Sequence, residues 1–210
     1  MMASLKEKKC LVVGGGKVAE RKIGALLDTG ADLHVVSPVC TRQIQDWAEQ
    51  GRLTLHERPF EAKDVKGAAL LFAATDNPAV NLAVYEAREP WQWINLADRP
   101  DLSTFVVPST LQRGSLQVAV STGGSYPGLA KKLRQQLEAR IGDEYGAYVS
   151  FLAEMRAHIL RLPLDEQRRR ERLAALLDDR FLQWTVEGKI AERDREAERL
   201  LQPDEMETEP

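Results

Sequence analysis

Lys9-Cys10-Leu11-Val12-Val13-Gly14-Gly15-Gly16-Lys17-Val18-Ala19-Glu20 is the stretch that decides the fold. The apolar run from Cys10 to Val13 predicts a buried strand, and the glycines after it lead into an amphipathic helix over 17–27. Their spacing, Gly14-x-Gly16-x-x-Ala19, matches the dinucleotide-binding fingerprint with alanine at its third small position. In this fingerprint the glycines permit a tight turn and the close approach of a pyrophosphate, and the small third residue lets helix and strand pack. Free amides at the helix N-terminus and the helix dipole then favour the phosphate charge.

A glycine triplet by itself is also what an ordinary turn contains, so the context of the triplet matters. Here a strand precedes it, a helix follows it, and a second strand is predicted over Asp32–Val36 after a typical helix end at Gly30. The acidic residue that usually binds the ribose hydroxyls after this second strand is missing, because Val36-Ser37-Pro38 stands there. Ser37 or the local backbone can serve the ribose instead, and Arg42 leaves room for a 2′-phosphate. The pattern favours NAD without excluding NADP.

The remaining part of residues 1–107 continues to alternate predicted strands and helices. The predicted elements are a helix over 39–50, a strand at 53–55, a continuous apolar strand over 67–74, a helix over 79–88 and a strand over Trp93–Leu96. Alternation of this kind predicts a parallel sheet wound by helices, with ligands at the carboxyl ends of the strands. Asp76, Asp98 and the glycine turn all follow such ends.

After Pro108 the pattern changes. Alternating residues over 115–120 predict a half-exposed strand, and the loop 121–128 leads into a helix that places Leu129, Leu133 and Leu137 on one face. Residues 144–201 are predicted to be helical throughout, with a break at Pro163. Two apolar stripes accompany them: Phe151, Met155 and Ile159, then Leu173, Leu176, Leu177, Phe181 and Trp184. The acidic tail over 203–210 is predicted to be disordered.

Composition limits the possible classes of protein. The chain has 210 residues, of which 43% are hydrophobic, so it can form a proper core. Its longest apolar run is too short to span a membrane, and no secretion leader is recognisable at its start. Cys10 and Cys40 form neither a disulfide framework nor a metal-ligand spacing. A net charge of −3 gives no support to a nucleic-acid binder, and acidic residues interleave the run Arg168-Arg169-Arg170, as on a solvated helix face. We therefore expect a cytoplasmic protein that binds neither nucleic acid nor membranes.

Few residues are obvious candidates for chemistry. The histidines His34, His56 and His158 are scattered along the chain and are interpreted as structural. Asp98 is the better candidate, because a carboxylate at a strand end can lie beside a nicotinamide. Taken alone, an aspartate close to a proline is also a common turn residue. No dense cluster of histidines, cysteines and carboxylates indicates a metal site.

Five motifs together resemble the siroheme-synthase dehydrogenase family, whose members are precorrin-2 dehydrogenases. In order, they are Val12-Val13-Gly14-Gly15-Gly16-Lys17-Val18-Ala19-Glu20-Arg21-Lys22, Ala73-Ala74-Thr75-Asp76, Asn95-Leu96-Ala97-Asp98, Ser103-Thr104-Phe105-Val106-Val107-Pro108 and Val120-Ser121-Thr122-Gly123-Gly124. They occur in the family's order and at its spacing, over about residues 5–140. The same module also forms the N-terminal part of a fused synthase that carries a methyltransferase, and this chain stops before any such module.

The resemblance implies NAD-dependent oxidation of precorrin-2 to sirohydrochlorin, with ferrous iron insertion by the same site in some members. It implies a homodimer and a Rossmann-like, doubly wound α/β fold followed by a small dimerisation region and a C-terminal helical domain. We accordingly divide the chain into an NAD-binding domain (1–112), a dimerisation region (113–145), a helical domain (146–202) and the tail (203–210). The family's functional aspartate falls on Asp98. A serine that carries phosphate in one branch of the family falls on Thr122, which is a departure.

Two sets of binding residues follow from the motifs and the resemblance. The expected coenzyme contacts are Gly14, Gly15, Gly16, Lys17, Val18, Ser37, Pro38, Val39, Thr75, Asp76 and Asn95. Precorrin-2 carries eight carboxylates, which local positive charge and loop amides can bind. The expected substrate contacts are Arg99, Arg113, Thr122, Gly123, Gly124 and Lys131, with Lys132 and Arg134 in the same basic cluster. For the lysines, ordinary helix solubility is an equal alternative.

Two other functions stay open at this point. One is a regulator that senses NAD(H) without turnover and uses its C-terminal helices to bind a partner. The other is a ferrochelatase that has lost redox activity, although the intact glycine loop argues against it.

Overall fold

The computed structural model describes residues 3–202, so the predicted disorder of 203–210 lies outside the described residues. The chain divides into two compact units, with the boundary between Val107 and Pro108. Each unit is described by itself.

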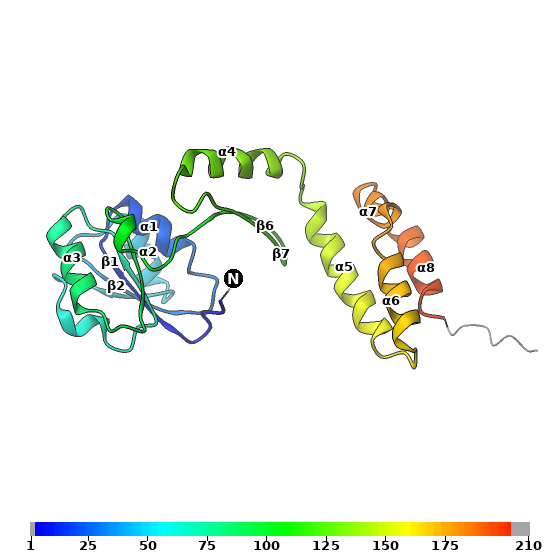
Figure 1. Cartoon of the computed structure of the whole chain (residues 1–210), viewed down its shortest axis with the longest axis horizontal. Coiled ribbons are helices and arrows are strands. Elements are labelled where there is room, and N and C mark those ends of the chain that lie inside the picture. The colour runs from blue at the N-terminus through cyan, green and yellow to red at the C-terminus, as the bar shows by residue number, and fades with distance from the viewer. Residues whose placement is uncertain (1–2, 203–210) are drawn as a thin grey trace, which may run out of the picture. The chain divides into compact units, whose positions relative to one another are not determined.

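The first unit contains a five-stranded parallel sheet with the strand order β3-β2-β1-β4-β5. The strands are β1 (Lys9–Val13), β2 (Asp32–Val36), β3 (Thr54–His56), β4 (Leu70–Ala73) and β5 (Trp93–Leu96). They are connected by helices α1 (Lys17–Gly24), α2 (Arg42–Glu49) and α3 (Pro78–Ala87) (Figure 1). The short 3-10 helix η1 (Ala62–Val65) lies between β3 and β4, and η2 (Pro100–Leu102) follows β5. The strand order reverses between β1 and β4, which is where ligands bind in open sheets of this type.

Side chains from alternate positions of each strand form a separate core on each face of this sheet. On one face, Cys10 and Val12 of β1 pack with Ile23 of α1 and Ile44 of α2. On the other face, a second cluster contains Leu11, Val13, Leu71, Val84 and Ile94 and thus joins the sheet to α3. Full burial of one such aliphatic side chain contributes about 1.5–3 kcal/mol. The two cores set the register in which Val13 lies beside both Val36 and Ala73, so the loops after β1, β2 and β4 begin at the same level.

The second unit begins with an antiparallel hairpin of β6 (Ser109–Arg113) and β7 (Leu116–Val120), against which α4 (Pro127–Glu138) packs (Figure 1). Four further helices follow: α5 (Glu144–Ile159), α6 (Glu166–Ala175), α7 (Asp179–Val186) and α8 (Ile190–Arg199). Phe151, Ile159, Leu176 and Phe181 are buried in the core that these four helices share.

The predicted parallel sheet is confirmed, and the strands over Asp32–Val36 and Trp93–Leu96 have the predicted bounds. The structure corrects several details. The first helix ends at Gly24 rather than at residue 27, and the second begins at Arg42 rather than at 39. The prediction missed β6, because Leu111 is its one buried residue among polar neighbours and so gives no alternating pattern.

The helical region also differs in detail from its prediction. The predicted break at Pro163 falls between α5 and α6, but the described part after it is three helices rather than one run, and Leu177 of the predicted apolar stripe is exposed. Leu129 and Leu133 of α4 are exposed as well. Across residues 3–202, none of the helices is both long enough and apolar enough to cross a membrane.

Candidate active site

The three glycines after β1 have three different environments. A Cβ added to Gly14 would lie 2.3 Å from the carbonyl oxygen of Ala74, and Gly14 has a φ of +123°, which only glycine adopts readily. A Cβ on Gly15 would lie 2.1 Å from the carbonyl oxygen of Val39. A Cβ on Gly16 would meet nothing within 4 Å. The first two glycines are therefore required by the fold, whereas the third leaves open space at the start of α1.

This open space is where the fingerprint expects a pyrophosphate. Gly16 is the N-cap of α1, and Gly16, Lys17 and Val18 are all exposed. The first amides of a helix have no partner within the helix, so they can donate to phosphate oxygens. Ala19 is completely buried, as the close packing of helix and strand requires. The residues present thus fit a dinucleotide coenzyme.

The loop after β2 packs directly on the glycine turn. The N–H of Thr41 donates to the carbonyl of Gly15 at 2.9 Å. Ser37 is 7% exposed and its hydroxyl donates to the carbonyl of Val39 at 2.7 Å, so this predicted ribose contact has little free surface. Pro38 and Val39 are exposed. Their backbone and side chains form the accessible surface of this loop.

Asp98 follows β5 and is linked to the loop after β4 by a buried amide. The side-chain nitrogen of Asn81 donates to Asp98 Oδ1 at 3.0 Å, and its oxygen accepts from the backbone N–H of Thr75 at 3.1 Å. Asn81 lies on α3 and is 1% exposed. It was not predicted as a site residue, although a polar residue three positions before Val84, on the same buried face of α3, was the signal available. Asp76, which was predicted, is exposed beside this link.

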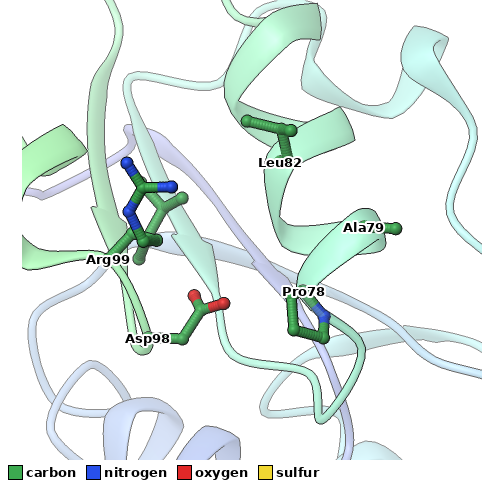
Figure 2. A pocket seen from close by; sticks show the side chains of 6 residues that line it. Pro78, Ala79, Leu82, Asp98 and Arg99 are labelled. Carbon is green, nitrogen blue, oxygen red and sulfur yellow. The ribbon is translucent and has the colours of Figure 1, made fainter.

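A small pocket of about 210 Å³ lies next to the Asp98 carboxylate. Its lining consists of Pro78, Ala79, Leu82, Leu96, Asp98 and Arg99. Figure 2 shows the carboxylate of Asp98 pointing into the space between Pro78 and Arg99. The guanidinium of Arg99 is paired with Asp101 at 2.6 Å, and this pairing raises the pKa of Arg99 and lowers that of Asp101. The Asp98 carboxylate thus lies between apolar side chains and a guanidinium that is already paired, where a ligand in the pocket can reach it.

Asn95, a predicted coenzyme contact, lies within β5 and is 9% exposed. Its oxygen accepts from Lys22 Nζ at 2.6 Å, and its nitrogen donates to the carbonyl of Phe105 at 3.0 Å. Lys22 also lies 5.0 Å from the centre of the Phe72 ring. Asn95 therefore connects α1 with the segment that leaves the sheet, and both polar groups of its amide are used within the protein.

The predicted substrate contacts of the second unit lie on the hairpin, on the loop after β7 and on α4. Arg113 donates to the carbonyl of Ile141 at 3.1 Å and pairs with Asp143 at 3.2 Å, so its guanidinium ties β6 to the segment between α4 and α5. Thr122 precedes Gly123 and Gly124, and its hydroxyl accepts from the N–H of Tyr126 at 3.1 Å. Lys131 is exposed on α4. Within 3–202, no group of three or more histidine, cysteine and acidic side chains is arranged to hold a metal ion.

Three family models match successive parts of the chain. The model described as "Putative NAD(P)-binding" matches residues 1–109, the one described as "Sirohaem biosynthesis protein central" matches residues 113–140, and the SirC C-terminal domain matches residues 145–183. A solved structure titled "SirC, precorrin-2 dehydrogenase" is similar over the whole chain. Its TM-score is 0.82 at 30% identity, and the match covers 96% of this chain and 97% of that one.

The chain belongs to the precorrin-2 dehydrogenase family.

Sequence relatives place the same family in larger proteins. The chain is 39% identical over 203 residues to a siroheme synthase of Methylococcus capsulatus and 36% identical over 210 residues to siroheme synthase 2 of Yersinia enterocolitica. These matches cover 94% and 100% of this chain but 41% and 42% of the relatives. The chain thus spans about two fifths of the length of these siroheme synthases. The family assignment makes the nucleotide a nicotinamide coenzyme, bound by the first unit.

Proposed function

We propose that this chain oxidises precorrin-2 to sirohydrochlorin with NAD as the acceptor. The observation that carries the proposal is the placement of Asp98 after β5, linked through Asn81 to the loop after β4, at the same edge of the sheet as the open glycine turn. The family assignment supplies the reaction class. The predicted Asp98 role gains support from this geometry.

The reaction removes two hydrogen atoms from the macrocycle, one as a hydride and one as a proton. A nicotinamide coenzyme held at the open turn around Gly16 would supply the acceptor for the hydride. The remaining proton needs a base. We assign this role to Asp98, whose exposed carboxylate can pass the proton on to solvent. The apolar side chains of Ala79 and Leu82 beside Asp98 provide a surface for the ring. The substrate carboxylates require cations, for which Arg99, Arg113 and Lys131 and the amides after Thr122 are the proposed partners.

The direct test is anaerobic incubation of the chain with precorrin-2 and NAD, followed by the absorbance of NADH and of the oxidised macrocycle. Asp98→Asn keeps the shape of the side chain but removes its basicity, so kcat should fall by about 10²- to 10⁴-fold while the Kd for NAD changes little. Glu86→Gln, which removes a charge from the exposed side of α3, is the matched control and should retain wild-type kcat. Wild-type turnover by Asp98→Asn would remove Asp98 from this role. A wild-type chain that binds NAD without reducing it would instead support the sensing function.

Addition of ferrous iron to the same reaction tests the second proposed activity. Iron is then a substrate, and its insertion into sirohydrochlorin releases two protons from ring nitrogens. The same carboxylate can accept them one after the other and pass each to solvent. If the chain is a chelatase without redox activity, iron should enter supplied sirohydrochlorin with no NAD requirement.

The cytoplasmic location indicated by the sequence stays a prediction.

We propose that the coenzyme is NAD rather than NADP, because the arginines near the end of β2 are already paired with carboxylates. Arg42, the candidate for a 2′-phosphate contact, pairs with Asp46 at 2.8 Å and with Glu49 at 3.4 Å. Arg58, which follows β3, pairs with Asp64 at 2.7 Å. A 2′-phosphate would have to compete with these carboxylates. Calorimetric titration should therefore give a Kd for NAD at least about tenfold lower than for NADP, a difference of about 1.4 kcal/mol. Equal or reversed affinities would contradict the proposal.

We also propose a homodimer, in which the hairpin β6–β7 and helix α4 lie at the interface. An isolated two-stranded hairpin is marginal in water, and the exposed Leu129 and Leu133 on α4 provide apolar surface beside it. The division of the second unit into a dimerisation region over 113–145 and a helical domain over 146–202 belongs to the same proposal.

A further inference from the structure

Asn81 has every hydrogen-bonding position of its amide occupied. Its oxygen accepts from the backbone N–H of Thr75 and lies 2.8 Å from the Thr75 hydroxyl. Its nitrogen donates to the carbonyl of Thr75 at 3.2 Å and to the carboxylate of Asp98 at 3.0 Å. Because a backbone N–H can only donate, the amide oxygen must face Thr75, and the amino group is then left to face Asp98. The orientation of the amide is thus decided by the loop after β4.

Asn81 joins two loops, one beside the proposed coenzyme site and the other beside the proposed substrate site. Thr75 follows Ala74, whose carbonyl oxygen packs against Gly14 in the coenzyme turn. Asp98 lines the pocket to which we assign the proposed substrate. Asp98 itself is exposed on a turn, where a carboxylate has considerable rotational freedom. A charge-assisted hydrogen bond from a buried amide restricts that freedom.

We propose that Asn81 is a positioning residue for Asp98, resting on the function proposed above. Its amide holds Oδ1 of Asp98, which leaves Oδ2 for the substrate proton, and it ties this orientation to the loop that packs on the coenzyme turn. The position of the Asp98 carboxylate relative to the coenzyme turn is thereby fixed. Asn81 itself touches neither ligand.

Asn81→Asp is the informative variant because it keeps the shape and the contact of one side-chain oxygen with the Thr75 N–H. The amino group that faced Asp98 becomes a second oxygen, so two carboxyl groups face each other and retain a proton to higher pH. We expect kcat at pH 7 to fall at least tenfold and the acid limb of the kcat profile to move upward by about one pH unit. The KM for NAD should stay within about threefold, since the glycine turn is unchanged.

Asn77→Asp is the matched control. It makes the same chemical change at the N-cap of the same helix. Aspartate caps a helix as well as asparagine does, so the bond that Asn77 accepts from the N–H of Ala79 is kept. This variant should retain wild-type kcat and pH profile. If folded Asn81→Asp, checked by circular dichroism, also retains both, Asn81 is merely structural and the inference is overturned.

A second measurement needs no turnover. The double variant Asn81→Asp/Asp98→Asn exchanges amide and carboxylate, so the hydrogen bond between the two positions can form again in reverse. Its Tm should recover part of what Asn81→Asp loses, without any recovery of activity. A Tm no higher than that of Asn81→Asp overturns the contact and with it the inference. A wild-type chain that does not oxidise precorrin-2 overturns the proposed function instead, so the two failures are distinguishable.

Discussion

At the scale of single residues, two glycines of the turn are required by the packing of the fold, whereas the third leaves space for a ligand. Gly14 and Gly15 are buried, and a Cβ on either would collide with a backbone carbonyl oxygen. Gly16 is exposed and has a φ of −83°, which any residue adopts. The absence of a side chain at Gly16 leaves open space at the start of α1, and the fold itself does not require that space.

This difference gives a prediction. Gly16→Ala should leave Tm within about 3 °C of the wild type but raise the Kd for NAD at least about tenfold, because the added methyl occupies the space expected for the pyrophosphate. Gly14→Ala should instead lower the free energy of unfolding by about 2–4 kcal/mol, from backbone strain and the overlap with the Ala74 carbonyl. Calorimetry and denaturant unfolding of both variants check this. Unaltered NAD binding by Gly16→Ala would place the coenzyme elsewhere.

At the scale of elements, polar side chains connect helices to strands through the apolar cores. Asn81 links α3 to the turn after β5, and Lys22 links α1 to Asn95 in the middle of β5. Burial lowers the pKa of the Lys22 ammonium, and nearby Arg21 lowers it further. The protein therefore retains this charge at some cost to its stability.

The sign of that cost predicts a pH dependence. Because the folded pKa of Lys22 lies below its ordinary value of 10.5, the unfolded chain binds more protons in the interval between the two values. The contribution of Lys22 to stability should therefore rise as pH increases through that interval and level off above about 10.5. Lys22→Met has no titrating group at this position, so its free energy of unfolding should not rise in this interval. In denaturant unfolding, the difference in this free energy between the wild type and Lys22→Met should therefore increase between pH 7 and pH 10. Lys66→Met, at an exposed lysine, is the control; a deficit for Lys22→Met that is constant with pH would contradict the assignment.

At the scale of the whole molecule, the chain combines a unit with two complete cores and a unit whose hairpin has little core of its own. The sheet of the first unit is covered on both faces. In the second unit, Leu111 is the one fully buried residue of β6, and the residues of β7 are half-buried or exposed. A second copy of the chain is the proposed cover for this region.

The proposed dimer leads to a prediction for α4. Leu129→Asp/Leu133→Asp places two charges on the exposed apolar face of α4 and should shift the mass measured by light scattering from two chains to one. Leu177→Asp makes a comparable change at an exposed leucine between α6 and α7 and should leave the mass unchanged. A wild-type mass of one chain, or a double variant that stays dimeric, would contradict this interface.

By itself, the sequence determined the parallel α/β sheet, the glycine turn and Asp98 as the carboxylate at a strand end. These follow from local patterns: continuous apolar strands, glycine spacing and the position of a charge after a strand. Only the tertiary structure decided which polar residues work together, because Asn81 and Asp98, or Lys22 and Asn95, are far apart in the chain and meet through the order of the strands. It also decided that Gly14 and Gly15 pack against the protein whereas Gly16 is left open. The physical reason is that a side chain's type sets what it can bind, whereas its partners depend on the register in which two buried faces pack.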